Sequence, residues 1–194
     1  VKAHGVTVMC AAPAVANAHP HFSPGARAAA DAQGRIALVH NGIIENHDEL
    51  RAELQAKGFV FTSQTDTEVI AHLVAELYQG DLFEAVQQAV PRLKGAFAIA
   101  VFCRDEPHRV VGAREGSPLV LGVGDGETFL ASDAMALAGV TDKIVYLADN
   151  EIAVITDRAI RVVHRDDGHV DHDVKLLETE SNQVNRRVDR QLPQ

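Results

Sequence analysis

The residues from Gly95 to Cys103 form an apolar run that no polar or charged side chain interrupts. A run of this length, with Ile, Val and Phe among small residues, is typical of a strand that is buried on both faces. Such a strand needs an apolar layer above it and another below it, so it restricts the chain to layered folds. The 194 residues are enough for one domain with a full core.

Helical patterns come before this run and extended patterns follow it. Apolar residues spaced three or four apart predict helices over 46–57, 67–77 and 81–90, the second opened by a capping box of Thr65 and Glu68. The predicted strands are 59–61, 109–113, 119–123, 128–131, 143–147, 151–156 and 158–164. Turns are expected at Asp125-Gly126, at Asp149-Asn150 as a hairpin joining 143–147 to 151–156, and at 166–168. Helices followed by strands, with no β–α alternation, predict an α+β fold.

A second apolar strand begins near Arg35 and leads into Asn41-Gly42. Asn-Gly is a strong turn pair, because both residues tolerate a positive φ, so we expect a sharp turn there. Asn46 then begins the first helix, with Glu49 completing a capping box. An Asn carboxamide beside a Gly backbone N–H at a strand end can hold a developing oxyanion. The simpler interpretation is an Asn-Gly pair that only turns the chain.

Charge and composition restrict the partners. The net charge of −9 argues against nucleic acid and anionic membranes. Cys10 and Cys103 do not suggest a disulfide scaffold, and Cys103 is expected to pack as a small hydrophobic residue. No run of about 18 apolar residues could span a membrane, and the start of the chain lacks the pattern of a signal peptide. His19 and His21 have no further ligand at a metal-site spacing. We expect a cytoplasmic protein with no metal and no cofactor.

Four segments in the same order resemble one known family. They are Val39-His40-Asn41-Gly42-Ile43-Ile44-Glu45-Asn46, Asn17-Ala18-His19-Pro20-His21, Thr65-Asp66-Thr67-Glu68-Val69-Ile70-Ala71-His72-Leu73, and Gly116-Ser117-Pro118-Leu119-Val120-Leu121-Gly122 together with Ala131-Ser132-Asp133. From about Asn17 to about Thr156, the chain resembles the glutaminase domain of the glutamine–fructose-6-phosphate aminotransferase (isomerising) family, also called the glucosamine-6-phosphate synthases.

The resemblance implies a fold and a site. The fold is the four-layer αββα arrangement of N-terminal nucleophile hydrolases, with two stacked antiparallel sheets between helical layers, here as domain 1–180 followed by a linker or tail at 181–194. In the site, the Asn41 side chain and the Gly42 N–H hold the oxyanion, and Gly42 also contacts substrate. Asp66 binds the α-ammonium of glutamine. Without the resemblance, Asp66 is a residue that the helix dipole favours at a helix start. We expect Asn41, Gly42 and Asp66 to line one pocket.

The chain also departs from the family pattern. The family's mature chain begins with the cysteine nucleophile, whose free α-amine serves as base, whereas this chain begins with Val1. The family's first strands are missing or replaced. Val6 stands where an arginine is expected to bind the glutamine carboxylate, and valine cannot form that pair. Cys10 is internal and has no free α-amine. We therefore expect a protein of this sequence to release no ammonia from glutamine above background.

Three functions remain open at this point. The first is the glutaminase part of an enzyme that supplies ammonia to fructose-6-phosphate, with a sugar-isomerase domain following it and a homo-oligomeric parent protein. The second is a non-catalytic domain of the same fold, kept for binding or assembly. The third is the glutaminase domain of another class II amidotransferase, such as that of purine synthesis or asparagine synthetase.

Overall fold

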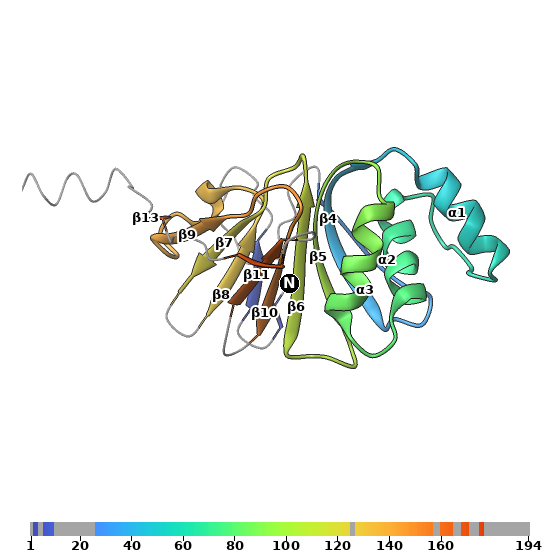
Figure 1. The fold of residues 1–194 in the computed structure, drawn as a ribbon, viewed down its shortest axis with the longest axis horizontal. Coiled ribbons are helices and arrows are strands. Elements are labelled where there is room, and N and C mark those ends of the chain that lie inside the picture. Colours follow the sequence, from blue (N-terminus) through green and yellow to red (C-terminus); the bar gives the residue numbers. More distant parts are fainter. Residues whose placement is uncertain are drawn as a thin grey trace, which may run out of the picture.

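The fold is described from a computed structural model, which covers residues 2–3, 6–9, 26–124, 127–156, 160–164, 168–170 and 175–176. Within these residues, four strands are followed by three α-helices and then by the remaining strands, as in an α+β fold (Figure 1). The elements are β1 (Lys2–Ala3), β2 (Val6–Met9), β3 (Ala26–Ala30), β4 (Ile36–Ile44), α1 (His47–Ala56), α2 (Asp66–Leu77), α3 (Leu82–Ala89), the 3-10 helix η1 (Val90–Arg92), β5 (Gly95–Cys103), β6 (Arg109–Glu115), β7 (Val120–Val123), β8 (Thr128–Ala131), the 3-10 helix η2 (Ala134–Leu137), β9 (Lys143–Tyr146), β10 (Glu151–Thr156), β11 (Ile160–His164), β12 (Gly168–Val170) and β13 (Lys175–Leu176). The predictions for 10–25, for Asp125-Gly126, for 166–167 and for the tail 181–194 fall outside the described residues.

The described strands form two sheets. One has the order β12-β11-β10-β6-β5-β4-β3, and all its neighbours pair antiparallel. The other has the order β1-β2-β8-β7-β9-β13 and is antiparallel except where β2 runs parallel to β8. Helices α1 to α3 lie on one side of the β4–β5–β6 sheet, and β7 to β9 lie on the other side (Figure 1). The predicted α+β fold with two stacked sheets is confirmed, with β2 as a parallel exception.

Three apolar layers hold these elements together. The largest lies between the helices and the β4–β5–β6 sheet, and includes Leu54, Ile70 and Ile99. The second lies between the two sheets and combines residues such as Ala100 of β5 with Leu121 of β7. A third covers the outer face of the β7–β8–β9 sheet, where η2 packs. In the described part of the chain, η2 is therefore the helical cover of that outer face.

Strand β5 coincides with the apolar run that the sequence singles out. Phe97, Ile99 and Val101 belong to the helix-side core, whereas Ala98 and Ala100 belong to the core between the sheets. Both faces are apolar because both are covered, which is what the sequence predicts. Ala98 and Ala100 face the second sheet together with the larger Phe102, and Phe97, Ile99 and Val101 face the helices.

Two predicted strand arrangements are wrong. Strand β9 pairs with β7 and β13, whereas β10 pairs with β6 and β11, so the connection between them crosses from one sheet to the other. In β9, Ile144 and Val145 point into apolar layers on opposite faces of the smaller sheet. An isolated hairpin of β9 with β10 would not give β9 an apolar layer on each face. The segment 59–61 is a loop rather than a strand. Its Phe59 and Phe61 rings instead pack edge-on against His72 of α2.

The helices match their predicted ranges within a residue or two, but the predicted capping box at Asn46 is wrong. Asn46 makes no side-chain cap to α1. Its carboxamide donates to Arg92 O at 2.9 Å and accepts from Lys94 N at 3.0 Å, which ties the start of α1 to the start of β5. Gly58 ends the helix region with a φ of 92°, as predicted. No helix in the described part of the chain is long and apolar enough to cross a membrane.

Candidate active site

Asn41 and Gly42 lie inside strand β4 and do not form the predicted turn. They pair with Ala98 and Phe97 of β5, and the strand continues to Ile44. Gly42 has a φ of 126°, and a Cβ atom built on it would lie 2.1 Å from the Ala96 carbonyl oxygen. The glycine is therefore required by close approach to β5 rather than by a change of direction.

Beyond Gly42, one edge of β4 carries no described strand partner. The pairing of β3 with β4 begins at Ala26 opposite Asn41. In an antiparallel strand, successive N–H groups point to opposite edges. Glu45 N donates to Lys94 O on the β5 side, and Ile44 N points to the opposite edge. The same alternation predicts that the Gly42 N–H points to the Ile44 edge.

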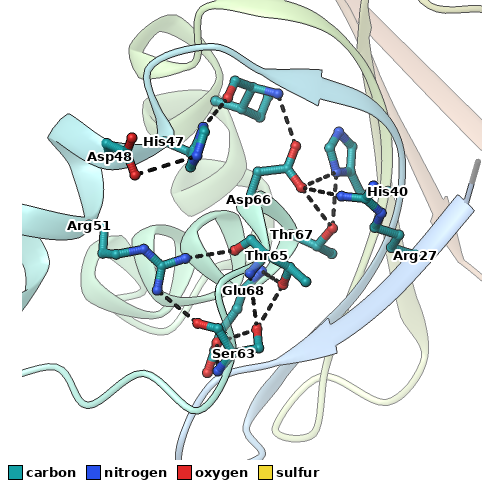
Figure 2. A network of polar contacts seen from close by, with 11 residues as sticks. Arg27, His40, His47, Asp48, Arg51, Ser63, Thr65, Asp66, Thr67 and Glu68 are labelled. Atoms are coloured by element: carbon teal, nitrogen blue, oxygen red, sulfur yellow. Dashed lines mark hydrogen bonds and ion pairs between the residues drawn. The ribbon is translucent and has the colours of Figure 1, made fainter.

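Asp66 meets β4 at this edge (Figure 2). It is the first residue of α2, and only 6% of it is exposed. Its Oδ2 accepts from Ile44 N at 3.1 Å, and its Oδ1 accepts from an Arg27 guanidinium N–H at 3.2 Å. The α2 N-cap is instead supplied by Thr65, whose hydroxyl accepts from Glu68 N at 3.3 Å. The Asp66 carboxylate therefore does not cap α2 and instead contacts strand β4.

Thr67 contacts Asp66 Oδ1, the oxygen that also accepts from Arg27, and His40 contacts Thr67 in turn. The Thr67 hydroxyl lies 3.4 Å from Asp66 Oδ1, and His40 Nδ1 lies 3.2 Å from the same hydroxyl. Because the hydroxyl donates to the carboxylate, it accepts from the protonated Nδ1 of His40. Burial lowers the pKa of His40, against a raising effect of Asp66 and together with a lowering effect of Arg27. His40 is therefore a neutral donor at neutral pH.

Glu68 fixes the loop that leads into α2. Its carboxylate accepts from Thr62 N and the Thr62 hydroxyl at 2.7 and 2.8 Å, and from Ser63 N and the Ser63 hydroxyl at 2.6 Å each. Burial alone would raise the pKa of Glu68, but the hydrogen bonds from Ser63 and Thr62 outweigh it and lower the pKa to about 2. The predicted capping box is half right, since Glu68 holds the preceding loop instead of returning to Thr65 N.

Arg51 of α1 holds the same loop from the other side. Its guanidinium donates to Ser63 O at 2.9 Å and to Thr65 O at 3.0 Å, and it stacks over the Phe61 ring at 4.5 Å. These contacts and the Glu68 carboxylate fix the chain that delivers Asp66 to β4 (Figure 2). The sequence analysis predicted neither this role of Arg51 nor the loop contacts of Glu68. Arg51 was missed because an Arg in an amphipathic helix has the pattern of a solvent-exposed residue.

The structure brings Asp66 to the strand that carries Asn41 and Gly42, but it does not place all three side by side. The side chains of β4 alternate, with His40 toward α2 and Val39 in the core between the sheets. Asn41 therefore follows Val39 and projects from the face opposite His40, where it is half-buried. A common pocket for the three residues stays a prediction. Among the described residues, no cluster of His, Cys, Asp or Glu is arranged to hold a metal ion.

Two stacked sheets, a helical layer over one of them and a buried carboxylate at a strand edge define an α+β protein of the N-terminal nucleophile hydrolase type. Solved structures support this class. The glutamine phosphoribosylpyrophosphate amidotransferase from B. subtilis, complexed with ADP and GMP, matches with a TM-score of 0.65 and 22% identity over 78% of this chain and 35% of that one. A structure described as the allosteric regulatory enzyme of purine biosynthesis matches with a TM-score of 0.60 and 25% identity, over 72% of this chain and 30% of that one.

Sequence comparison identifies the family. The profile described as "Glutamine amidotransferase domain" matches residues 23–139, more than half of the chain. The chain belongs to this glutamine amidotransferase domain family. A curated relative from Bordetella pertussis is 73% identical over 140 residues, covering 72% of this chain and 22% of the relative. One from Symbiobacterium thermophilum is 47% identical over 174 residues, covering 90% of this chain and 27% of the relative. Both are named glutamine–fructose-6-phosphate aminotransferase [isomerizing], and this chain spans about a quarter of their length.

Proposed function

We propose that this chain is the glutamine-binding domain of an enzyme that supplies ammonia from glutamine to fructose-6-phosphate. The observation that carries the proposal is the buried Asp66 carboxylate, fixed by Ile44 N at the edge of β4, two residues beyond Gly42. A carboxylate held in this way is suited to an ammonium group, and a strand-edge N–H is suited to a carbonyl oxygen. Glutamine carries both groups.

Each site residue has a defined part in amide hydrolysis. Asp66 binds the α-ammonium and thereby fixes the amide relative to β4. When a nucleophile adds to the amide carbon, negative charge develops on the oxygen, and the Gly42 N–H and the Asn41 carboxamide stabilise it. Removing one such donor typically costs about 3 kcal/mol of transition-state stabilisation. Cys103 is buried within β5 and cannot be the attacking thiol, and Cys10 lies outside the described residues.

The remaining assignments follow from the relatives. We propose that the domain spans 1–180, with 181–194 as a linker to a sugar-isomerase domain, in a cytoplasmic homo-oligomer. The greater length of the relatives supports a further domain. A non-catalytic role of the same fold is the second candidate, and it is favoured by Val6 at the position of the expected arginine. The curated relatives favour the sugar enzyme over the purine enzymes, whose likeness rests on fold.

The test is the binding of L-glutamine by titration calorimetry, compared with 4-carbamoylbutanoate, which lacks the α-ammonium. A lost charge-assisted hydrogen bond costs about 1.5–3 kcal/mol, so Asp66→Asn should weaken glutamine binding about 10- to 100-fold. The analogue should bind both proteins equally. Asp48→Asn is the control, since its side chain is 89% exposed on α1. Equal glutamine affinity of the wild type and Asp66→Asn would refute the role of Asp66.

A further inference from the structure

We propose that Arg27 binds the α-carboxylate of the same amino-acid ligand whose α-ammonium Asp66 binds. This inference rests on the proposed function, because it needs an amino acid at Asp66. It assigns to β3 a part of the site that neither the sequence motifs nor the comparisons place there.

The position of Arg27 follows from the pairing of β3 with β4. Arg27 lies directly opposite His40 in the register, and directly paired residues project from the same face of a sheet. His40 contacts Thr67 of α2 on that face, so Arg27 also projects toward the start of α2. Its guanidinium reaches Asp66 Oδ1 at 3.2 Å (Figure 2).

The two side chains differ in exposure in a way that suits a ligand. The Arg27 side chain is 56% exposed, whereas that of Asp66 is 6% exposed. The positive group therefore lies at the open end of the site and the negative group at the closed end. In the described part of the chain, Asp66 is the hydrogen-bond partner that the structure gives to the guanidinium, which has five N–H donors. Donors remain for an incoming carboxylate.

Charge complementarity identifies the ligand class. An α-amino acid carries an ammonium and a carboxylate on one carbon, so its two charges lie side by side. Arg27 and Asp66 present the opposite charges side by side. Guanidinium binds carboxylate through a planar fork of N–H groups. Valine at position 6, where the resemblance implies an arginine, offers no such group, so Arg27 is the described cation placed beside Asp66.

The same contact has a second interpretation with the opposite consequence. If Arg27 only neutralises Asp66, a ligand ammonium must displace it, and removing Arg27 would strengthen binding. If Arg27 binds the ligand carboxylate, removing it weakens binding. The direction of the change in affinity therefore separates the two interpretations.

The experiment is calorimetric titration of the whole chain with L-glutamine and with 4-aminobutanamide, which is glutamine without its α-carboxylate. Arg27→Gln should weaken glutamine binding about tenfold and should not weaken 4-aminobutanamide binding. Arg27→Lys should give a smaller loss, since it keeps the charge and loses the fork. Arg104→Gln is the matched control, with a side chain that is 66% exposed on the β5–β6 turn.

The outcomes separate this inference from the proposed function. Unchanged or tighter glutamine binding by Arg27→Gln overturns the role of Arg27, and so does an equal loss for both ligands. If Asp66→Asn weakens glutamine binding while Arg27→Gln does not, the proposed function stands and this inference fails. If the wild type binds no glutamine, both fail.

Discussion

Replacing Glu68 with glutamine removes the acceptor that holds the loop before α2. The carboxylate accepts four hydrogen bonds, two from Thr62 and two from Ser63. Glutamine keeps one acceptor oxygen and directs an NH₂ group at donors of the loop, so some of these donors lose their partner.

The pKa of Glu68 sets the size of the effect. It falls from an ordinary value of 4.5 to about 2, and each pKa unit corresponds to about 1.4 kcal/mol. Ionised Glu68 therefore adds about 3 kcal/mol to the free energy of unfolding. Because the pKa is lowered in the folded state, this contribution is complete above pH 4.5 and is lost as the pH falls toward 2. By pH 3, about 2 kcal/mol of it has gone.

The assay is urea unfolding of the wild type and Glu68→Gln between pH 7 and pH 3. We expect the variant to be less stable by about 3 kcal/mol at pH 7 and by about 1 kcal/mol at pH 3. Glu49→Gln, exposed on α1, should differ little from the wild type at either pH. A difference between wild type and Glu68→Gln that stays constant over this range would refute the reasoning.

Two further predictions concern β4. Because burial lowers the pKa of His40, the unfolded chain takes up its proton first as the pH falls below about 6.5, so stability should decrease there. His40→Gln should reduce this slope in urea unfolding, and a slope equal to that of the wild type would contradict the assignment. Gly42→Ala would place a Cβ 2.1 Å from Ala96 O at a φ of 126°, so it should cost at least about 3 kcal/mol or prevent folding. Gly34→Ala is the control, with a φ of 61° and nothing within 4 Å of its Cβ, and should cost about 1 kcal/mol in the same assay.

The sequence predicts the parts of the fold whose signal is local. Strand β5 is recognised because both its faces are apolar, and α2 because Thr65 caps it before an apolar stripe. The loop after α1 is mispredicted because Phe59 and Phe61 have strand-like spacing but pack around His72.

Predictions fail where a long-range partner outweighs a local preference. Asn41-Gly42 has a turn signature, yet pairing with β5 keeps it in a strand. Asn46 has a capping signature, yet its carboxamide bonds to Arg92 and Lys94. The contact between Asp66 and Arg27 joins residues 39 positions apart, and no local sequence pattern predicts it. The resemblance pointed to Asp66, whereas Arg27 became visible only in three dimensions.

Glutamine is expected to bind at the β4 edge beside Asp66. The most direct measurement is a titration of the ¹⁵N-labelled chain with L-glutamine, followed by the amide resonances of Gly42 and Ile44. The account predicts that both amides shift together and saturate at the calorimetric dissociation constant, and that Asp66→Asn moves this saturation to higher glutamine concentration. Glutamine binding that shifts amides elsewhere and leaves Gly42 and Ile44 unchanged would contradict it.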